Sequence, residues 1–285
     1  MSGADLTSMI QSVVRPEDYI TYILKEKGNE EIRKEIPETC LIVYSETFYR
    51  RVKGYQKVVD IGSRKPTEIY LIKRDEGKNF GIVCPQYGDG MASATLAELT
   101  ALGFRNFLSL GTTGHPTNRA NLEVKVGDIL LVNDALIYEG ASHHHLPLPD
   151  LLRYYAFART LPAQRPHPKA REILQDILKQ RELAFKEGTV ATTGAFYMES
   201  PLFIEEALRR NVIALDMETT ALFSRAEYHN RTKQADITIA TILYFSDIVQ
   251  LNETSGEWNV QFLSGDVTEA ESKILPVVID FIDRI

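Results

Sequence analysis

The sequence has only two cysteines, Cys40 and Cys84, among its 285 residues. A network of disulfides is therefore excluded as the basis of the fold. Each cysteine lies in a short apolar run, CLIVY or GIVCP. We expect two buried, reduced thiols, with a single disulfide or a catalytic pair as the alternative.

The chain also lacks an apolar run of the roughly 20 residues that a membrane-spanning helix needs. Its first residues carry no basic segment followed by a long apolar one, so they do not resemble a secretory signal. The net charge of -7 gives no general attraction to nucleic acid or to an anionic membrane. We expect a cytoplasmic protein that binds small molecules, with neither nucleic acid nor membrane as a partner.

Two classes of motif are missing as well. No GxGxxG follows the first apolar run, and the later GDGMAS has the wrong spacing, which disfavours a dinucleotide-dependent oxidoreductase. His143, His144 and His145 are adjacent, and adjacent side chains cannot all point at one ion. No spaced set of cysteines and histidines accompanies them, so we expect no metal site.

The first 37 residues form a charged leading segment. Residues 15–37 are expected to form one amphipathic helix that Pro37 closes. No Gly/Ser-rich or Pro-rich linker interrupts the chain after residue 40. We therefore expect residues 1–37 to be a helical extension and residues 38–285 to be a single catalytic domain.

The rest of the chain alternates two patterns. Short β-branched and aromatic runs predict strands that start near residues 40, 57, 68, 80, 106, 128, 189, 212 and 237. Apolar residues three and four apart predict helices over 91–103, 167–184, 201–211 and 218–230. This alternation predicts an α/β fold with one mainly parallel or mixed sheet covered by helices on both faces.

Ligands of such sheets bind at the carboxyl ends of strands, so the segments that follow strands are the places to search. GTTG at 111–114 allows close backbone approach and offers two hydroxyls. LDMETT at 215–220 and FSDIV at 245–249 each place a carboxylate after a strand. Taken alone, the first is an ordinary turn, and the carboxylates are helix caps.

These segments also occur in a specific order. ALGFRNFLSLGTTG is followed by VKVGDILLVNDA, EGASHHH, GTVATTGAFY, ALDMETTALF and YFSDIV. The ordered set covers about residues 40–285 and closely resembles the uridine and purine nucleoside phosphorylase family. The resemblance implies a partly closed sheet and an enzyme that cleaves a nucleoside with phosphate to give free base and ribose 1-phosphate. It also implies a homodimer or trimer of dimers, with no cofactor beyond phosphate as co-substrate.

The resemblance assigns residues to the two halves of a nucleoside. Glu218 would bind the 2′- and 3′-hydroxyls of the ribose, because one carboxylate has two acceptor oxygens. The other residues implied on the ribose side are Thr112, Met217 and His143. The residues implied on the base side are Thr113, Gly114, Phe196, Tyr197 and Asp216. Aromatic rings there would stack on the base.

Asp247, in FSDIV, matches the aspartate with which purine-cleaving relatives hydrogen-bond or protonate N7 of the base. The C1′–N bond breaks with oxocarbenium character, and a purine anion leaves poorly until it is protonated. Uridine-cleaving relatives carry a Gln and an Arg shortly after the aromatic pair, and FYMESPLFIEE has neither. Asp247 is therefore predicted to be the general acid, and the base is predicted to be a purine.

The phosphate site departs from the family pattern. Many phosphorylases carry an Arg where this chain has Ser109, and YSETFYRR replaces a Gly-Asp-Pro loop followed by Arg. Arg50, Arg51 and Arg64, together with Thr112, are the residues left for phosphate. Because a dianionic phosphate needs bidentate donors, a hydrolytic nucleosidase with the same ribose and base site is the main alternative.

Two further alternatives remain. The stretch from GTTG to GAS most resembles a uridine phosphorylase, which favours a pyrimidine base. A non-catalytic nucleoside-binding protein is the alternative from another class. Asp247 argues against it, because a binding protein needs no acid for a leaving group.

Overall fold

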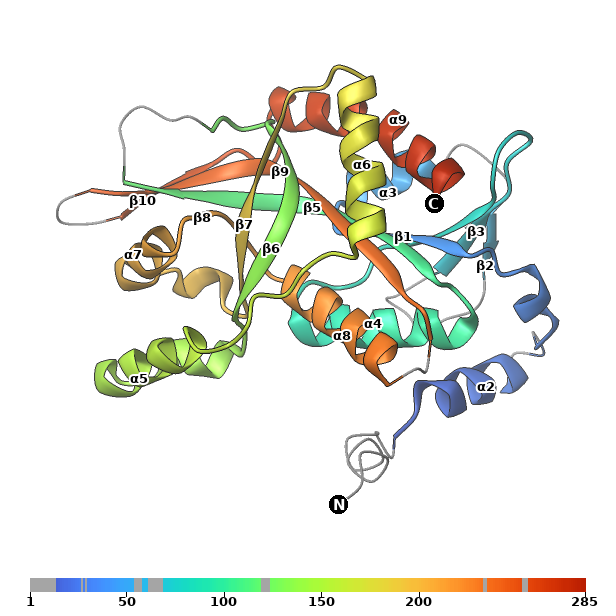
Figure 1. The fold of residues 1–285 in the computed structure, drawn as a ribbon, viewed down its shortest axis with the longest axis horizontal. Helices are drawn as coiled ribbons and strands as arrows, with labels where there is room; N and C mark the ends of the chain where they lie inside the picture. The colour runs from blue at the N-terminus through green and yellow to red at the C-terminus, as the bar shows by residue number, and fades with distance from the viewer. Residues whose placement is uncertain are drawn as a thin grey trace.

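One mixed sheet runs through the protein (Figure 1). The computed structural model describes residues 14–26, 28, 30–53, 58–60, 69–118, 124–232, 235–252 and 256–285. Its strands are β1 (Thr39–Val43), β2 (Val58–Asp60), β3 (Ile69–Ile72), β4 (Phe80–Val83), β5 (Asn106–Thr117), β6 (Ile129–Tyr138), β7 (Phe185–Thr193), β8 (Val212–Asp216), β9 (Thr238–Leu251) and β10 (Gly256–Val260).

The ten strands lie in the order β10-β9-β6-β7-β8-β5-β1-β4-β3-β2. Strand β9 also pairs with β5, so strands β9, β6, β7, β8 and β5 close into a ring. The long β5–β9 pair is parallel, whereas β5–β8 and β6–β9 are antiparallel. The predicted α/β class with a partly closed mixed sheet is confirmed.

Helices cover both faces of the sheet. They are α2 (Pro16–Glu26), α3 (Glu46–Lys53), α4 (Asp89–Leu102), α5 (Leu148–Ala158), α6 (Pro168–Gln180), α7 (Pro201–Arg209), α8 (Thr219–Arg231) and α9 (Gly265–Arg284). In Figure 1, α4, α8 and α2 lie below the sheet and α6 and α9 above it. Strand β1 is buried at every position, which explains its unbroken apolar sequence TCLIV.

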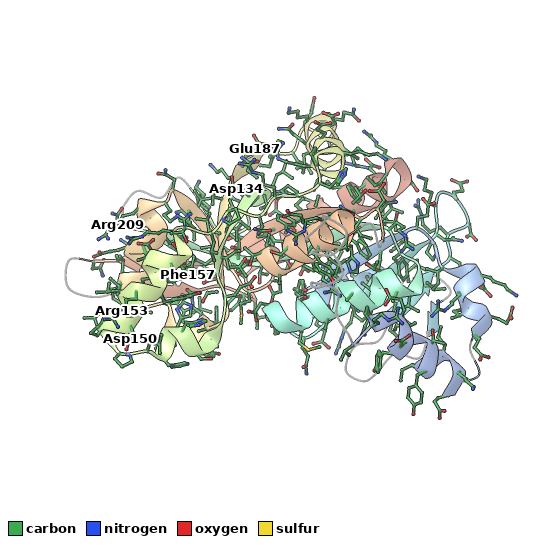
Figure 2. All side chains as sticks on the ribbon, turned by 60° about the horizontal axis from the view of Figure 1, so that its bottom comes forward. Asp134, Asp150, Arg153, Phe157, Glu187 and Arg209 are labelled. Carbon is green, nitrogen blue, oxygen red and sulfur yellow. The ribbon has the colours of Figure 1, made fainter. Side chains whose placement is uncertain are left out.

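Helices α5 and α7 cover the end of the sheet nearest β10 (Figure 1). Helix α5 buries Leu151, Tyr155 and Ala158, which lie on one helical face. Figure 2 labels Asp150, Arg153 and Phe157 on the outer part of this end. Phe157 is exposed, and Arg153 pairs with Asp150 at 2.8 Å. The apolar face of α5 therefore packs inward while its other face meets solvent.

The leading segment differs from its prediction. In place of one helix over residues 15–37, the structure has α2 and then a 3₁₀ helix, η1 (Glu30–Glu35). Gly28 lies between them with a φ of 61°, a left-handed conformation that ends helices. Ile20 and Leu24 of α2 are buried in the core cluster that also contains α4 residues.

Other local predictions can be compared with the structure directly. All nine predicted strands are present, and β10 was not predicted. The YSETFYRR segment was expected to be a loop, but most of it is helix α3, because the Ser45 hydroxyl caps the N–H of Phe48 at 3.2 Å. Both cysteines are free thiols; Cys40 is buried, as predicted, whereas Cys84 is only partly buried. Within the described ranges, no helix has the length and apolar character needed to cross a bilayer.

Candidate active site

Glu218 lies in the short turn between β8 and α8, and its side chain is buried. Its Oε1 accepts a hydrogen bond of 2.7 Å from the backbone N–H of Gly88, just before α4. Gly88 has a φ of 105°, a conformation that a side chain would strain. Burial, with the nearby charge of Asp216, raises the pKa of Glu218 to about 8. The carboxyl group is therefore held between the starts of two helices.

Asp216 and Thr113 make contacts within the protein. Asp216 accepts hydrogen bonds from the Thr192 hydroxyl at 2.6 Å and from the backbone N–H of Thr219 at 2.9 Å. The Thr219 hydroxyl donates to it as well. Thr113 donates its hydroxyl to the Leu215 carbonyl at 2.8 Å. These contacts cap α8 and tie β5 to β8, so contact of either side chain with a base stays a prediction.

Thr112 and Met217 are both partly exposed, unlike most of their neighbours. Thr112 is on β5, and Met217 directly precedes Glu218. Among the described contacts, the Thr112 hydroxyl makes no hydrogen bond to the protein. Both side chains therefore keep some surface that a ligand could reach.

Asp247 is placed by an irregularity in β9. Thr113 pairs with Phe245 and Gly114 with Asp247, so Ser246 forms a bulge between them. Asp247 accepts hydrogen bonds of 2.8 Å at both oxygens, from Ser246 Oγ and from the indole N–H of Trp258. Burial raises the pKa of Asp247, and these two hydrogen bonds oppose the rise. A side chain at position 114 would crowd this carboxylate, because a Cβ on Gly114 would lie 2.9 Å from Asp247 Oδ2.

Trp258 contacts this carboxylate and belongs to a cluster of aromatic side chains. The 3₁₀ helix η3 (Phe196–Met198) brings Phe196 edge-on to Trp258 of β10, with ring centroids 5.4 Å apart. Tyr197 lies beside Phe196 at 5.0 Å and is 87% exposed. Phe262 completes the aromatic cluster, 6.2 Å from Trp258. Trp258 and Phe262 were not found from the sequence, since β10 carries no motif of the family.

Glu199 is a second carboxyl group affected by Asp247, and no motif in the sequence pointed to it. It follows η3 directly, and the Asp247 charge acts on it. Burial and then Asp247 raise the pKa of Glu199 to about 8. No described side chain forms a hydrogen bond or an ion pair with it. Within the described part of the chain, Glu199 is therefore a carboxyl group without a hydrogen-bond or ion-pair partner, and the Asp247 charge acts on it.

His143 lies on the 3₁₀ helix η2 (Ala141–His145) and stacks on Tyr154 with ring centroids 4.4 Å apart. This segment contacts the start of the loop that carries Phe196 and Tyr197. A Cβ on Gly194 would lie 2.9 Å from the backbone nitrogen of Ala141. His144 instead is buried and lies 2.9 Å from the Tyr138 carbonyl. No group of three or more potential metal ligands occurs within the described part of the chain.

The arginines predicted for phosphate have other partners. Arg50 is largely exposed and pairs with Glu46 at 2.5 Å on the same helix. Arg51 donates to Ser272 at 2.9 Å and lies 3.9 Å from the buried Glu271. Arg64 lies outside the described residues. Ser109 is buried in β5. The pairing of Gly114 with Leu215 and with Asp247 brings the segments of the predicted ribose and base residues to neighbouring strands, and their roles stay predictions. Arg50 and Arg51 instead contact Glu46 of α3 and Ser272 and Glu271 of α9.

The model of the phosphorylase superfamily matches residues 41–283, most of the chain. The chain belongs to the phosphorylase superfamily. Two named relatives align with parts of the chain. A uridine phosphorylase of Haemophilus influenzae is 40% identical over 68 residues, 24% of this chain and 25% of that protein. A guanosine phosphorylase of Halorubrum lacusprofundi is 24% identical over 148 residues, 51% of this chain and 52% of that protein.

These alignments therefore span about a quarter and about half of the relatives' own lengths. A similar solved structure is the purine nucleoside phosphorylase of Toxoplasma gondii in complex with immucillin-H. Its TM-score is 0.67 at 15% identity, with 88% of this chain and 92% of that chain covered. This likeness shows that the two proteins share a fold over 88% of this chain.

Proposed function

We propose that this superfamily member cleaves the N-glycosidic bond of a purine nucleoside. The observation that carries the proposal is the register around Gly114 on β5. Gly114 pairs with Leu215 of β8 on one side and with Asp247 of β9 on the other. Glu218 follows Leu215 by three residues, so two buried carboxyl groups flank one strand end.

The end of the site at Glu218 suits the ribose of a nucleoside, and the end at Asp247 suits its base. Glu218 would accept hydrogen bonds from two ribose hydroxyls, with Met217 as an apolar contact and Thr112 and His143 at the rim. Phe196 and Tyr197 would stack on the base. A carboxyl group beside these rings suits a purine, whose ring nitrogen must gain a proton before the base leaves. Thr113, Gly114 and Asp216 would shape this end of the pocket.

As the sugar–base bond breaks, positive charge develops on the ribose ring. The buried carboxyl groups would stabilise that charge, and the proton donated to the base would make it a better leaving group. The sequence predicts Asp247 as the donor. Substitution of Asp247 by Asn should therefore slow release of a purine base sharply, and unchanged turnover would remove Asp247 as the acid.

Phosphate is proposed as the nucleophile because the chain belongs to the phosphorylase superfamily. Water is a second candidate, and the arginine contacts favour it. Arg50 is neutralised by Glu46, and Arg51 lies against Ser272 and Glu271. A dianionic phosphate would have to displace these partners or use other donors.

One assay separates the candidates. Purified protein is incubated with guanosine, inosine, adenosine and uridine, with and without phosphate, while free base, ribose and ribose 1-phosphate are measured. Base release that needs phosphate supports phosphorolysis, and equal release without it supports hydrolysis. Preferred cleavage of uridine would contradict the purine assignment. Binding of nucleosides with no release of base would make the protein a nucleoside-binding member of the superfamily.

We also propose that residues 38–285 form the catalytic domain, that residues 1–37 are a helical extension, and that the protein acts as a homodimer or trimer of dimers. Analytical ultracentrifugation of the full chain tests the assembly. A monomer at the concentration used in the activity assay would contradict it.

A further inference from the structure

Trp258 lies on β10, the strand at the end of the sheet that the sequence did not predict. Strand β10 pairs antiparallel with β9, and Trp258 is opposite Val249 while Val260 is opposite Asp247. Opposite residues of such a pair point to the same face of the sheet, as do residues two apart on one strand. Trp258 is therefore the diagonal neighbour of Asp247, with its side chain within reach of the carboxyl group.

The indole of Trp258 holds one oxygen of that carboxyl group. Its Nε1–H donates to Asp247 Oδ2 at 2.8 Å, and an indole N–H can only donate. The other oxygen, Oδ1, accepts from the hydroxyl of Ser246, the preceding residue on β9. A Cβ on Gly114 would lie 2.9 Å from Oδ2, so this oxygen also lies against β5. Trp258 therefore fixes the carboxyl group from a second strand, and the group cannot rotate without breaking this hydrogen bond.

Aromatic contacts fix the indole in turn. Phe196 of η3 lies 5.4 Å from the Trp258 ring at an angle of 80°, and Phe262 lies 6.2 Å from it at 72°. Aromatic pairs prefer such edge-to-face arrangements, which gives the indole a defined orientation. Phe196 is also a ring proposed to stack on the base. The Trp258 side chain thus connects the carboxyl group of Asp247 to the ring on which the base would lie.

We propose that Trp258 is a positioning residue that holds the Asp247 carboxyl group in one orientation relative to Phe196, so that a purine stacked on Phe196 meets this group. The proposal rests on the proposed cleavage of nucleosides. Trp258 acts through Asp247, and it does so whether Asp247 donates a proton to the base or accepts a hydrogen bond from it. A misplacement of about 1 Å can lower a rate about 100-fold, so a contact that only orients Asp247 can control turnover.

The same contact affects the ionisation of Asp247. Burial raises the pKa of Asp247, and the hydrogen bonds from Trp258 and then from Ser246 oppose the rise. Loss of the indole N–H should therefore raise this pKa further. Titratable groups on the neighbouring elements are Glu199 after η3, His115 of β5 and Glu257 of β10. A substitution of Trp258 leaves all three in place, so a change in the titration of Asp247 reports the lost hydrogen bond.

Trp258→Phe tests the proposal, because phenylalanine keeps an aromatic ring and lacks the N–H donor. With the purine nucleoside that wild type cleaves fastest, kcat should fall by about 10- to 100-fold, the loss of one hydrogen bond to a charged group. KM should stay within about threefold, since the aromatic ring remains. The limb of the kcat/KM pH profile that is absent from Asp247→Asn should move to higher pH. Glu257→Gln, on the same exposed strand, is the matched control.

A double-mutant cycle determines whether Trp258 acts through Asp247. In protein that already carries Asp247→Ala, Trp258→Phe should change kcat/KM by less than about threefold, because no carboxyl group is left to orient. Additive losses would contradict the proposal.

The indole also gives a signal that is independent of activity. The chain has one tryptophan, so protein labelled with nitrogen-15 at tryptophan should show one indole N–H resonance. The resonance should shift as Asp247 ionises, and this shift should vanish in Asp247→Asn. Thermal unfolding of each variant checks that it folds.

Three further results would overturn the proposal. Unchanged kcat in Trp258→Phe, or a change in KM alone, would exclude a positioning role while the proposed function stands. An indole resonance that does not respond to the ionisation of Asp247 would contradict the contact itself. If wild type cleaves no nucleoside although the resonance follows Asp247, the proposed function fails, and the positioning role fails with it while the contact stands.

Discussion

At the scale of single residues, Glu218 links ligand binding to protonation. Its pKa is about 8 in the free protein, so it holds a proton at neutral pH. Two ribose hydroxyls would need it as an acceptor at both oxygens, which favours the ionised form. We predict that a purine nucleoside binds more tightly as pH rises toward 8, by at most about tenfold per pH unit, with release of a proton.

Calorimetry in two buffers of different ionisation enthalpy measures this proton release. Glu218→Gln should weaken binding by about 10- to 100-fold, the cost of lost hydrogen bonds to a charged group, and should abolish the proton release. Glu227→Gln, on the exposed face of the same helix, is the control. Binding that is independent of pH in wild type would contradict the role of Glu218.

At this scale, the sequence predicted which segments form the candidate site but not which residues contact one another. LDMETT and FSDIV were recognised, but the partners of their carboxylates could not be predicted, because Asp216 and Thr192 lie 24 residues apart. Glu199 stayed unnoticed for the same reason. A glutamate in FYMES has no distinctive pattern, and its burial and nearness to Asp247 arise only when η3 packs near β9.

At the scale of elements, the β5–β9 pair controls the geometry of Asp247. Gly114→Ala would put a Cβ 2.9 Å from Asp247 Oδ2, so the carboxylate would have to turn away from Trp258. We predict a fall in kcat/KM for a purine nucleoside of about 100-fold, the cost of an error near 1 Å in a catalytic site. Gly256→Ala is the control in the β9–β10 hairpin, because its Cβ would lie an ordinary 3.7 Å from Leu251. Equal effects of the two substitutions on kcat/KM would contradict this prediction.

Strands and helices could be predicted from the sequence where burial gave their residues a regular apolar pattern. Strands such as β1 are apolar throughout, and their runs could be read directly. Strand β10 is exposed at all five positions, so GEWNV has no alternation and forms a strand only through pairing with β9. Helix α3 did carry a readable signal, since Ser45 is a capping residue and Phe48 and Val52 lie four apart on its buried face.

At the scale of the whole molecule, Glu199 and Glu218 make stability depend on pH. Both have an ordinary pKa of 4.5 and a folded pKa of about 8. Between these values the unfolded chain has lost protons that the folded protein keeps. Stability should therefore fall as pH rises from about 4.5 to 8, by at most about 1.4 kcal/mol per pH unit for each group.

Urea unfolding at pH 6 and pH 8 measures this slope. The neutral variants Glu199→Gln and Glu218→Gln should each gain stability relative to wild type at pH 8 compared with pH 6. If the free energy of unfolding of a variant differs from that of wild type by the same amount at pH 6 and at pH 8, the raised pKa of the substituted residue is contradicted.

The ring of strands shows how far the sequence predicts the architecture of the whole molecule. Strand periodicity indicated a mixed sheet, whereas its closure came only from the family resemblance. Closure depends on β9, which pairs with β5, β6 and β10 along its 14 residues, and no local pattern encodes three partners.

Trp258 is the single tryptophan of the chain, and its indole donates to Asp247 while its ring packs at nearly a right angle to Phe196. The tryptophan fluorescence of the protein therefore comes from one indole at the proposed base end, and a stacked base should quench it. Titration with a purine base should change emission at 295 nm excitation (about where tryptophan alone absorbs), with no label and no turnover. The same signal, followed in a stopped-flow instrument, would separate the arrival of the base from the chemistry that follows.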